Sequence, residues 1–295
     1  MREVVVAAVQ MRMPQWDRDA NVASAVAHVQ SAAERGAHII VLPELFELPY
    51  FCTEQDAAHF DHARPFANND TTSRFSQLAA ELRVVLPISF FEQAGQVFYN
   101  TVAMIDADGT VLGRYRKTHI PDGPGYNEKY YFTPGDTGYK VWHTQYARIG
   151  VGICWDQWFP ECARAMALMG AEVLLYPTAI GSEPHDASID SAAHWQTVMR
   201  GHAAANVMPV LAANRIGTEQ GRDFAQTYYG SSFIAGSQGE LLQAADRTQE
   251  TTLLARLDLD NAARKRAAWG LFRDRRPQTY GALASSDGAL RAAGA

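Results

Sequence analysis

Glu44, Lys117 and Cys154 carry side chains that together can hydrolyse a carbonyl compound. They stand in the segments "VLPELF", "GRYRK" and "VGICWDQWFPE". A cysteine thiol, whose ordinary pKa is about 8.5, is mostly protonated at neutral pH and needs a base before it can attack. A glutamate between apolar residues can be that base, because burial raises the pKa of a carboxyl group towards neutrality. A lysine ammonium near the cysteine would stabilise a thiolate and an oxyanion.

Each of these residues also has a plain structural interpretation. A free cysteine is commonly a small buried hydrophobe, which is the favoured interpretation for Cys52 and Cys162. A loop glutamate or a lysine at a strand end is often only solvated. A rival mechanism uses His119, two residues beyond Lys117, as the base of a Cys/His pair with Cys154.

The three candidate residues follow the ends of expected strands. Apolar or alternating runs at 37–42, 110–117 and 146–154 predict strands that end at or just before them. Strand ends at the carboxyl edge of a sheet are where α/β proteins place their sites. Within the second run, the period of two puts Lys117 on the face opposite to Arg114 and Arg116. The sequence therefore predicts that one sheet edge gathers the three functional groups.

The rest of the chain alternates strands and helices. Periodic apolar residues predict helices at 21–35, 72–82, 159–169, 192–206 and 261–269. Apolar runs predict further strands at 3–10, 84–90, 97–106, 172–178 and 208–214, and a final strand group between 228 and 259. This pattern indicates a mixed α/β protein with helices packed on a sheet. We expect one domain, 1–280, followed by a flexible Ala/Gly-rich tail, 281–295.

The composition is that of an ordinary globular protein, with 47% hydrophobic and 20% charged residues among 295. A net charge of -6 without any Lys/Arg cluster argues against nucleic acid as a partner. The apolar run in "MREVVVAAVQM" is too short to span a membrane. Three cysteines are too few for a disulfide scaffold. We therefore expect a cytoplasmic protein with no membrane partner.

The order and spacing of the glutamate, lysine and cysteine motifs resemble those of the nitrilase (carbon–nitrogen hydrolase) superfamily, from Arg2 to about Tyr280. The resemblance implies a four-layer α-β-β-α sandwich, no metal or organic cofactor, and a homo-oligomer. It also implies roles: Cys154 as the nucleophile, Glu44 as its base, and Lys117 in stabilising the oxyanion. The backbone N–H of Trp155 would share that last role, and Glu128 falls where the family carries a supporting second glutamate.

Further segments, among them "PGYNEKYYFTPGDTG" and "WGLFRDRRPQTY", resemble the branch of this superfamily that hydrolyses N-carbamoylputrescine to putrescine, carbon dioxide and ammonia in polyamine biosynthesis. No arginine follows Cys154 in "CWDQW", so the sequence offers no cation there for a substrate carboxylate. We expect a small cationic ureido substrate whose amine end meets Glu183. The other expected substrate contacts are Tyr50, Asp122, Trp155 and Ala179.

Three alternatives remain open from the sequence. The first is another amidase or ureidase of the superfamily that acts on a different N-carbamoyl amine or amide. The second is a binding protein that keeps the fold without catalysis, which the complete set of Glu44, Lys117 and Cys154 argues against. The third is a redox thiol protein, although no resolving cysteine lies close to Cys154 in the sequence.

Overall fold

The computed structural model of the chain describes residues 2–222 and 225–289. The strands are β1 (Glu3–Gln10), β2 (Ile39–Val41), β3 (Leu86–Ala94), β4 (Val97–Ile105), β5 (Val111–Arg116), β6 (Val141–His143), β7 (Arg148–Val151), β8 (Val173–Pro177), β9 (Val210–Ala213), β10 (Ile216–Gln220), β11 (Ala225–Tyr229), β12 (Phe233–Ala235), β13 (Leu241–Ala244) and β14 (Thr251–Asp258). The α-helices are α1 (Arg18–Glu34), α2 (Asp70–Leu82), α3 (Glu128–Tyr131), α4 (Pro160–Leu168), α5 (Ala192–Asn206) and α6 (Leu259–Trp269). Short 3-10 helices are η1 (Phe51–Thr53), η2 (Ala57–His62), η3 (Cys154–Trp158), η4 (Pro277–Thr279) and η5 (Gly281–Ala284).

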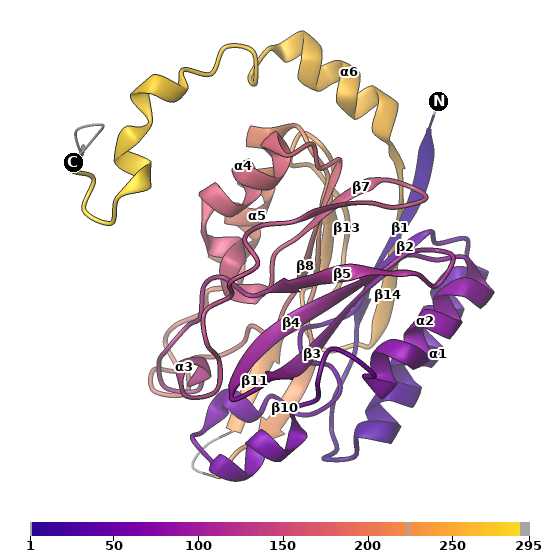
Figure 1. Ribbon diagram of the computed structural model, residues 1–295, viewed down its shortest axis with the longest axis vertical. Coiled ribbons are helices and arrows are strands. Elements are labelled where there is room, and N and C mark those ends of the chain that lie inside the picture. Colours follow the sequence, from indigo (N-terminus) through magenta and orange to yellow (C-terminus); the bar gives the residue numbers. More distant parts are fainter. Residues whose placement is uncertain (1, 223–224, 290–295) are drawn as a thin grey trace.

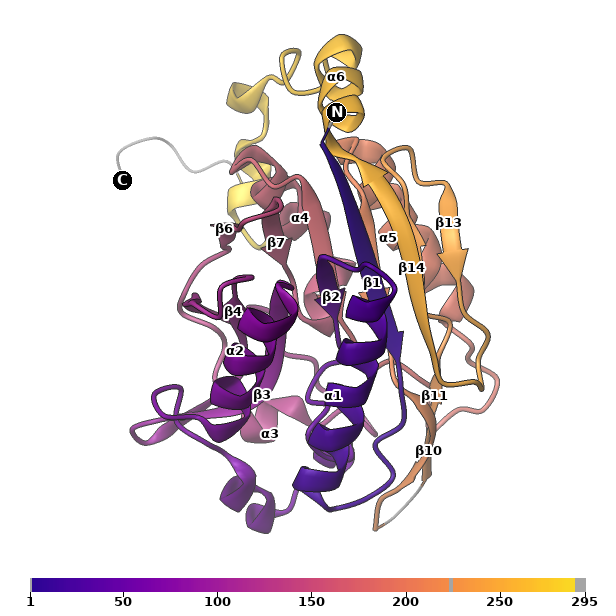
Figure 2. The same cartoon turned by 90° about the vertical axis from the view of Figure 1, so that its right-hand side faces the viewer.

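Two sheets form the centre of the molecule (Figure 1). One has the strand order β13-β12-β9-β8-β7-β6. The other combines β14-β1-β2 with β3-β4-β5, which a parallel bridge between Ile39 and Val85 connects. A hairpin of β10 and β11 extends from one end of the sandwich (Figure 2).

Three apolar clusters establish the order of the layers. The cluster between the sheets joins Val6 and Val41 of one sheet to Val151 and Leu175 of the other. A second cluster packs α1 and α2 on the outer face of the sheet that contains β1, β2 and β3, and a third packs α4 and α5 on the outer face of the sheet that contains β8, β9 and β12. The expected four-layer α-β-β-α sandwich is therefore confirmed, since each layer buries an apolar face against the next.

The N-terminal strand–helix–strand unit shows how local sequence sets these elements. β1 has the predicted bounds, and β2 pairs parallel with it. α1 begins earlier than the predicted 21–35, because the side chain of Asp17 accepts a hydrogen bond from the backbone N–H of Ala20 and caps the helix. Gly36 follows the helix with a φ of 86°, a left-handed conformation that glycine adopts readily.

Parallel pairing brings several strand ends to one edge of the sandwich. β7, β8 and β9 run parallel as neighbours, so the segments that follow them meet at their carboxyl ends. Those segments begin with Gly152, Thr178 and Asn214, and β2 delivers Glu44 close to the same place, where the Glu44 N–H donates to the carbonyl of Thr178 at 3.3 Å. The edge predicted to gather functional groups therefore exists.

The chain beyond α6 contains η4 and η5 and is largely exposed. The last six residues of the expected tail, 290–295, lie outside the described residues, so the boundary at 280 and the flexibility of the tail stay predictions. Among the described residues, none of the helices combines the length and the apolar character that crossing a bilayer requires.

Candidate functional site

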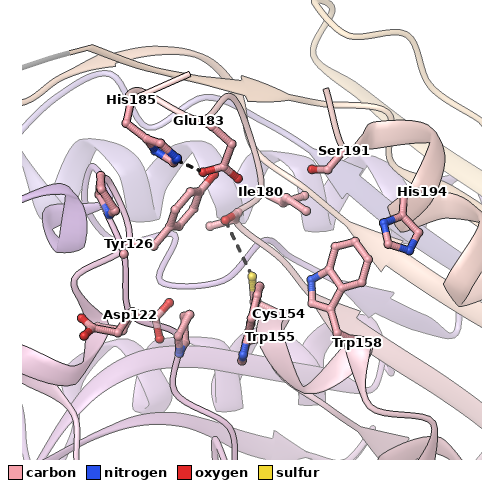
Figure 3. A pocket seen from close by; sticks show the side chains of 15 residues that line it. Asp122, Tyr126, Cys154, Trp155, Trp158, Ile180, Glu183, His185, Ser191 and His194 are labelled. Carbon is pink, nitrogen blue, oxygen red and sulfur yellow. Dashed lines mark hydrogen bonds and ion pairs between the residues drawn. The ribbon is translucent and has the colours of Figure 1, made fainter. Parts of the chain in front are cut away.

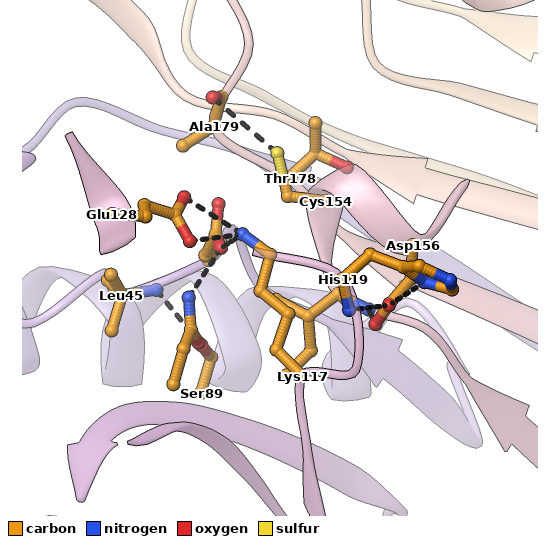
Figure 4. Close-up of polar contacts among 12 residues, drawn as sticks. Leu45, Ser89, Lys117, His119, Glu128, Cys154, Asp156, Thr178 and Ala179 are labelled. Carbon is orange, nitrogen blue, oxygen red and sulfur yellow. Dashed lines mark hydrogen bonds and ion pairs between the residues drawn. The ribbon is translucent and has the colours of Figure 1, made fainter. Parts of the chain in front are cut away.

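A buried cluster of one ammonium and two carboxylates lies at this edge (Figure 4). Nζ of Lys117 donates to Oε1 of Glu44 at 2.8 Å and to both oxygens of Glu128, at 2.8 and 2.6 Å. All three side chains are excluded from solvent. Burying such charges is costly unless they are paired, so their mutual contacts are what make the cluster tenable.

The strand alternation predicted around Lys117 is confirmed. Arg114 and Arg116 both bind Glu92, at 2.8 and 2.7 Å, on the face of β5 opposite to the cluster. Lys117 follows β5 directly, and its N–H donates to the carbonyl of Asn100 on β4. The pairing of β4 with β5 therefore aims the ammonium at Glu44.

Glu44 keeps one carboxylate oxygen without a partner. Its Oε1 accepts from Lys117 and, at 2.7 Å, from Nδ2 of Asn100. Its Oε2 is buried and has no hydrogen-bond partner among the described residues. An unpartnered oxygen is the one that a carboxylate uses to take up a proton. The geometry thus leaves Glu44 ready for the role of base that the sequence predicted.

Glu128 is held differently. Its carboxylate accepts from the hydroxyl of Tyr50 as well as from Lys117. Burial raises the pKa of Glu128 to about 7, although the Lys117 ammonium opposes the shift. Burial alone would lower the pKa of Lys117, but the carboxylates of Glu128 and Glu44 outweigh it and raise this pKa above its ordinary value. Both carboxylates thus favour the protonated form of Lys117, whose ammonium lies behind the cavity wall and does not line it.

Cys154 lies on a strained turn. The predicted strand 146–154 is too long, because β7 ends at Val151 and Cys154 opens η3 with a φ of 41°. That left-handed conformation is uncommon for a residue with a side chain and persists only where its surroundings enforce it. Here the N–H of Ile153 donates to the buried carboxylate of Asp156 at 2.9 Å, which closes the turn. The thiol contacts the carbonyl of Ala179 at 3.7 Å.

The electrostatic surroundings keep this thiol protonated at rest. Burial raises the pKa of Cys154 well above its ordinary value, the nearby carboxylate of Glu44 raises it further, and Lys117 only partly opposes them. A preformed thiolate is therefore disfavoured, and the proton must leave as the thiol attacks. This is the situation in which a neighbouring base is needed.

His119, the rival base, is committed elsewhere. Its Nδ1 lies 2.8 Å from Oδ1 of Asp156, and its ring stacks on Phe159 at a centroid distance of 3.6 Å. The backbone N–H of His119 also donates to Oδ1 of Asp156, at 2.9 Å. These contacts tie the segment after Lys117 to the turn after Cys154. The structure thus gives His119 a place beside the site rather than a partnership with the thiol.

A cavity of about 500 Å³ opens over Cys154 (Figure 3). Four of the expected substrate contacts line it, and so does Glu128: the four are Asp122, Trp155, Ala179 and Glu183. Lys and Arg are absent from the described residues of its wall. The described wall therefore offers acidic and aromatic groups but no permanent cation.

Tyr50 is placed differently from the expectation. Its side chain does not line the cavity; it lies beneath, 2% exposed, with its hydroxyl on Glu128. Sequence reasoning also missed Tyr126, whose ring lines the wall and whose hydroxyl accepts from the N–H of Gly181 at 3.0 Å. It missed Asn100 as a partner of Glu44. Tyr126 lies within the quoted segment "PGYNEKYYFTPGDTG" but was given no role, whereas Asn100 carried no sequence signal, because its partner Glu44 is distant in the chain.

Comparisons with known proteins agree with these features. The sequence pattern of the carbon-nitrogen hydrolase family matches residues 5–267. The chain is 55% identical over 294 residues to an N-carbamoylputrescine amidase of Arabidopsis thaliana, with 98% of each chain covered. It is 52% identical over 280 residues to a citrullinase of Francisella tularensis, covering 95% of this chain and 98% of the relative. A solved carbon-nitrogen hydrolase of Helicobacter pylori superposes with a TM-score of 0.91 at 36% identity, covering 97% of this chain and 99% of that one.

Proposed function

Since this chain belongs to the carbon–nitrogen hydrolase family, we propose that it hydrolyses N-carbamoylputrescine to putrescine, carbon dioxide and ammonia. One observation carries the choice of substrate: the described wall of the cavity over Cys154 contains three acidic residues, three aromatic residues and two histidines, but neither Lys nor Arg. A ureido group at Cys154 and an alkylammonium at the far end would suit that wall.

The first half of the reaction uses the free oxygen of Glu44. It removes the proton of Cys154 as the sulfur attacks the ureido carbonyl carbon, forming a C–S bond. The negative charge that develops on the carbonyl oxygen is stabilised by Lys117 and by the backbone N–H of Trp155. Glu44 then gives the proton to the departing nitrogen as the C–N bond breaks. The products of this half are an amine or ammonia and a carbamoyl thioester on Cys154.

The second half repeats the proton transfers with water. Glu44 takes a proton from a water molecule that attacks the thioester carbon, and the C–S bond breaks as Cys154 recovers its proton. The released carbamate, or carbamic acid, decomposes to carbon dioxide and the remaining nitrogen compound. One water is consumed overall, and the charges of the enzyme return to their starting state.

Glu183 is our candidate for binding the distal ammonium. It follows β8 and lines the cavity, where its carboxylate lies beside the ring of His185 (Figure 3). Partial burial raises the pKa of Glu183, which His185, 4.0 Å away, partly offsets. An arriving ammonium would favour the carboxylate form. Trp155 supplies an indole ring on the same wall, with which a cation also interacts favourably.

Citrulline is the second candidate substrate, because one relative is a citrullinase. Citrulline carries the same ureido group but ends in an α-carboxylate beside its amine. That carboxylate would enter a wall that contains Glu183 and Asp122, where like charges repel. The wall therefore favours the diamine derivative over the amino acid.

The test compares three ureido substrates on the wild-type protein and on Glu183→Gln, by ammonia release. We expect the wild type to favour N-carbamoylputrescine over both citrulline and butylurea, which lacks the terminal amine. Glu183→Gln should raise the KM for N-carbamoylputrescine about tenfold, as expected for loss of a charged contact, with kcat little changed. Its KM for butylurea should stay the same.

Asp186→Asn is the matched control, because Asp186 lies in the same loop, contacts Ser188 and does not line the cavity. It should behave as the wild type. A preference for citrulline would refute the proposed substrate, and an unchanged KM in Glu183→Gln would refute the role of Glu183.

We also propose a reducing, cytoplasmic location and a homo-oligomeric state. The first is supported by the need for a free thiol, and the three cysteines are unpaired and buried. The second is supported by Leu168 and Met169, adjacent large apolar residues at the end of α4 that are both about half exposed and that a contact between copies would bury.

A further inference from the structure

Two consecutive polar residues, Asn214 and Arg215, follow β9 and are completely buried. Neither lines the cavity, and the mechanism above does not use them. A buried polar side chain costs free energy unless it makes hydrogen bonds, so the partners of such residues indicate what they are for. Arg215 binds the backbone of the segment that carries Glu44, and Asn214 binds the backbone of the segment that contacts the thiol of Cys154.

Asn214 holds the segment that contacts the thiol. Its Oδ1 accepts from the N–H of Ile180 at 3.0 Å, and its Nδ2 donates to the carbonyl of Ile180 at 2.9 Å. The preceding residue, Ala179, has the carbonyl that Cys154 contacts. The amide of Asn214 thus acts as a two-point clamp on the loop after β8.

Arg215 holds the segment that carries the base. Its Nη2 donates to the carbonyl oxygens of Glu44, at 2.7 Å, and of Leu45, at 3.2 Å. Leu45 has a φ of 48°, so the turn after Glu44 is strained and needs outside support. The N–H of Leu45 is also held, by Oγ of Ser89 at 3.0 Å (Figure 4). The direction of the Glu44 side chain therefore depends on this turn.

Glu219 compensates the buried charge of Arg215 and connects it to Tyr50. Nη1 of Arg215 donates to Oε1 of Glu219 at 2.7 Å, so the pair is neutral overall. Oε2 of Glu219 accepts from the N–H of Tyr50 at 2.6 Å. Tyr50 in turn donates its hydroxyl to Glu128. The ion pair is thereby connected to both carboxylates that surround Lys117.

We propose that Asn214 and Arg215 are positioning residues that fix the free oxygen of Glu44 relative to the thiol of Cys154. Asn214 holds the thiol side and Arg215 the base side, and the two residues are adjacent in the chain. The proposal rests on Glu44 and Cys154 being the base and the nucleophile, but not on the identity of the substrate.

The test removes the ion pair as a whole, with Arg215→Gln combined with Glu219→Gln, so that no lone charge is left buried. We expect kcat to fall about 100-fold, because a misplacement of about 1 Å between reacting groups has that effect. KM should stay within about threefold, since neither residue touches the cavity. The assay uses whichever ureido or amide substrate the wild type hydrolyses fastest, so a wrong guess about the substrate leaves this test intact.

A second variant and a control keep the result interpretable. Arg215→Lys retains the charge opposite Glu219 but loses the forked donors to the turn, and should lower kcat about tenfold in a folded protein. Arg266→Gln is the control, because Arg266 also donates to two backbone carbonyls, of Asn206 and Val207, but at the end of α5, where none of these residues lines the cavity. It should lower the melting temperature and leave kcat unchanged.

The proposal is overturned if Arg215→Lys and any folded double variant keep kcat within threefold of the wild type. It is overturned equally if KM rises while kcat holds, which would make Arg215 a substrate-binding determinant. A loss of kcat in Arg266→Gln as large as in the Arg215 variants would show that the effect is general destabilisation.

Discussion

Cys154→Ala should lose hydrolysis almost completely, by at least about 10⁴-fold in kcat, because removing a covalent nucleophile leaves only binding and oxyanion stabilisation. The fold should persist. The thiol is small, and its described hydrogen bond is a long contact to Ala179. Ammonia release and circular dichroism measured on the same preparation separate the two effects.

Cys162→Ala is the matched control for that prediction. Cys162 is also buried, but it lies on α4 and packs against the sheet that contains β8 and β9 rather than facing the cavity. We expect it to lower thermal stability slightly and to keep the wild-type kcat. A Cys154→Ala protein with several per cent of the wild-type rate would mean that a different group attacks the substrate.

Glu44→Gln should lower kcat about 10³-fold, within the range that general acid–base catalysis supplies. Glutamine keeps the size of the side chain and an oxygen for Lys117 and Asn100. It replaces the unpartnered oxygen with an amide that cannot accept a proton. Because the thiol of Cys154 is protonated at rest, no thiolate is available to bypass the lost base.

Glu47→Gln controls for disturbance of the same turn, since Glu47 is buried three residues later and pairs with Arg18 at 2.6 Å. It should lower stability without the large loss in kcat. If Glu44→Gln retains the wild-type rate while His119→Ala loses it, the Cys/His mechanism is correct instead.

The sequence was sufficient to predict most helices and strands and to identify the three motifs that contain Glu44, Lys117 and Cys154. Apolar runs and helical periodicity predicted nearly every strand of the two sheets and most of the helices that pack on them, because each layer of the sandwich buries one face. Glu44, Lys117 and Cys154 stood out because each is a functional group that follows an apolar strand. Their convergence then follows from strand pairing, as the bond between Lys117 and Glu44 shows.

The residues that orient these groups could not be found in the same way. Arg215 stands in "LAANRIG" with nothing to indicate that its guanidinium meets carbonyls 170 and 171 positions earlier. The same is true of Asn100 on Glu44 and of Tyr50 on Glu128. Such contacts are set by the packing of distant segments, which local patterns do not encode.

The sequence also did not predict where the backbone turns before Cys154. The apolar run to residue 154 predicted a strand through the cysteine, whereas β7 ends at Val151. The reason lies in Asp156, whose buried carboxylate accepts from Ile153 and turns the backbone three residues early. A side-chain interaction with the backbone overrides a strand pattern in this way.

The central claim is that Cys154 carries a covalent intermediate, and acid-quenched mass spectrometry of the protein during turnover tests it most directly. A carbamoyl thioester is a poor electrophile because its nitrogen donates electrons to the carbonyl, so a fraction of the enzyme should hold it. In the modified fraction we predict a single carbamoyl or N-alkylcarbamoyl group, on the peptide that contains Cys154. The mass of this group will also tell which nitrogen departs first. The same group found on another residue during turnover would contradict the account.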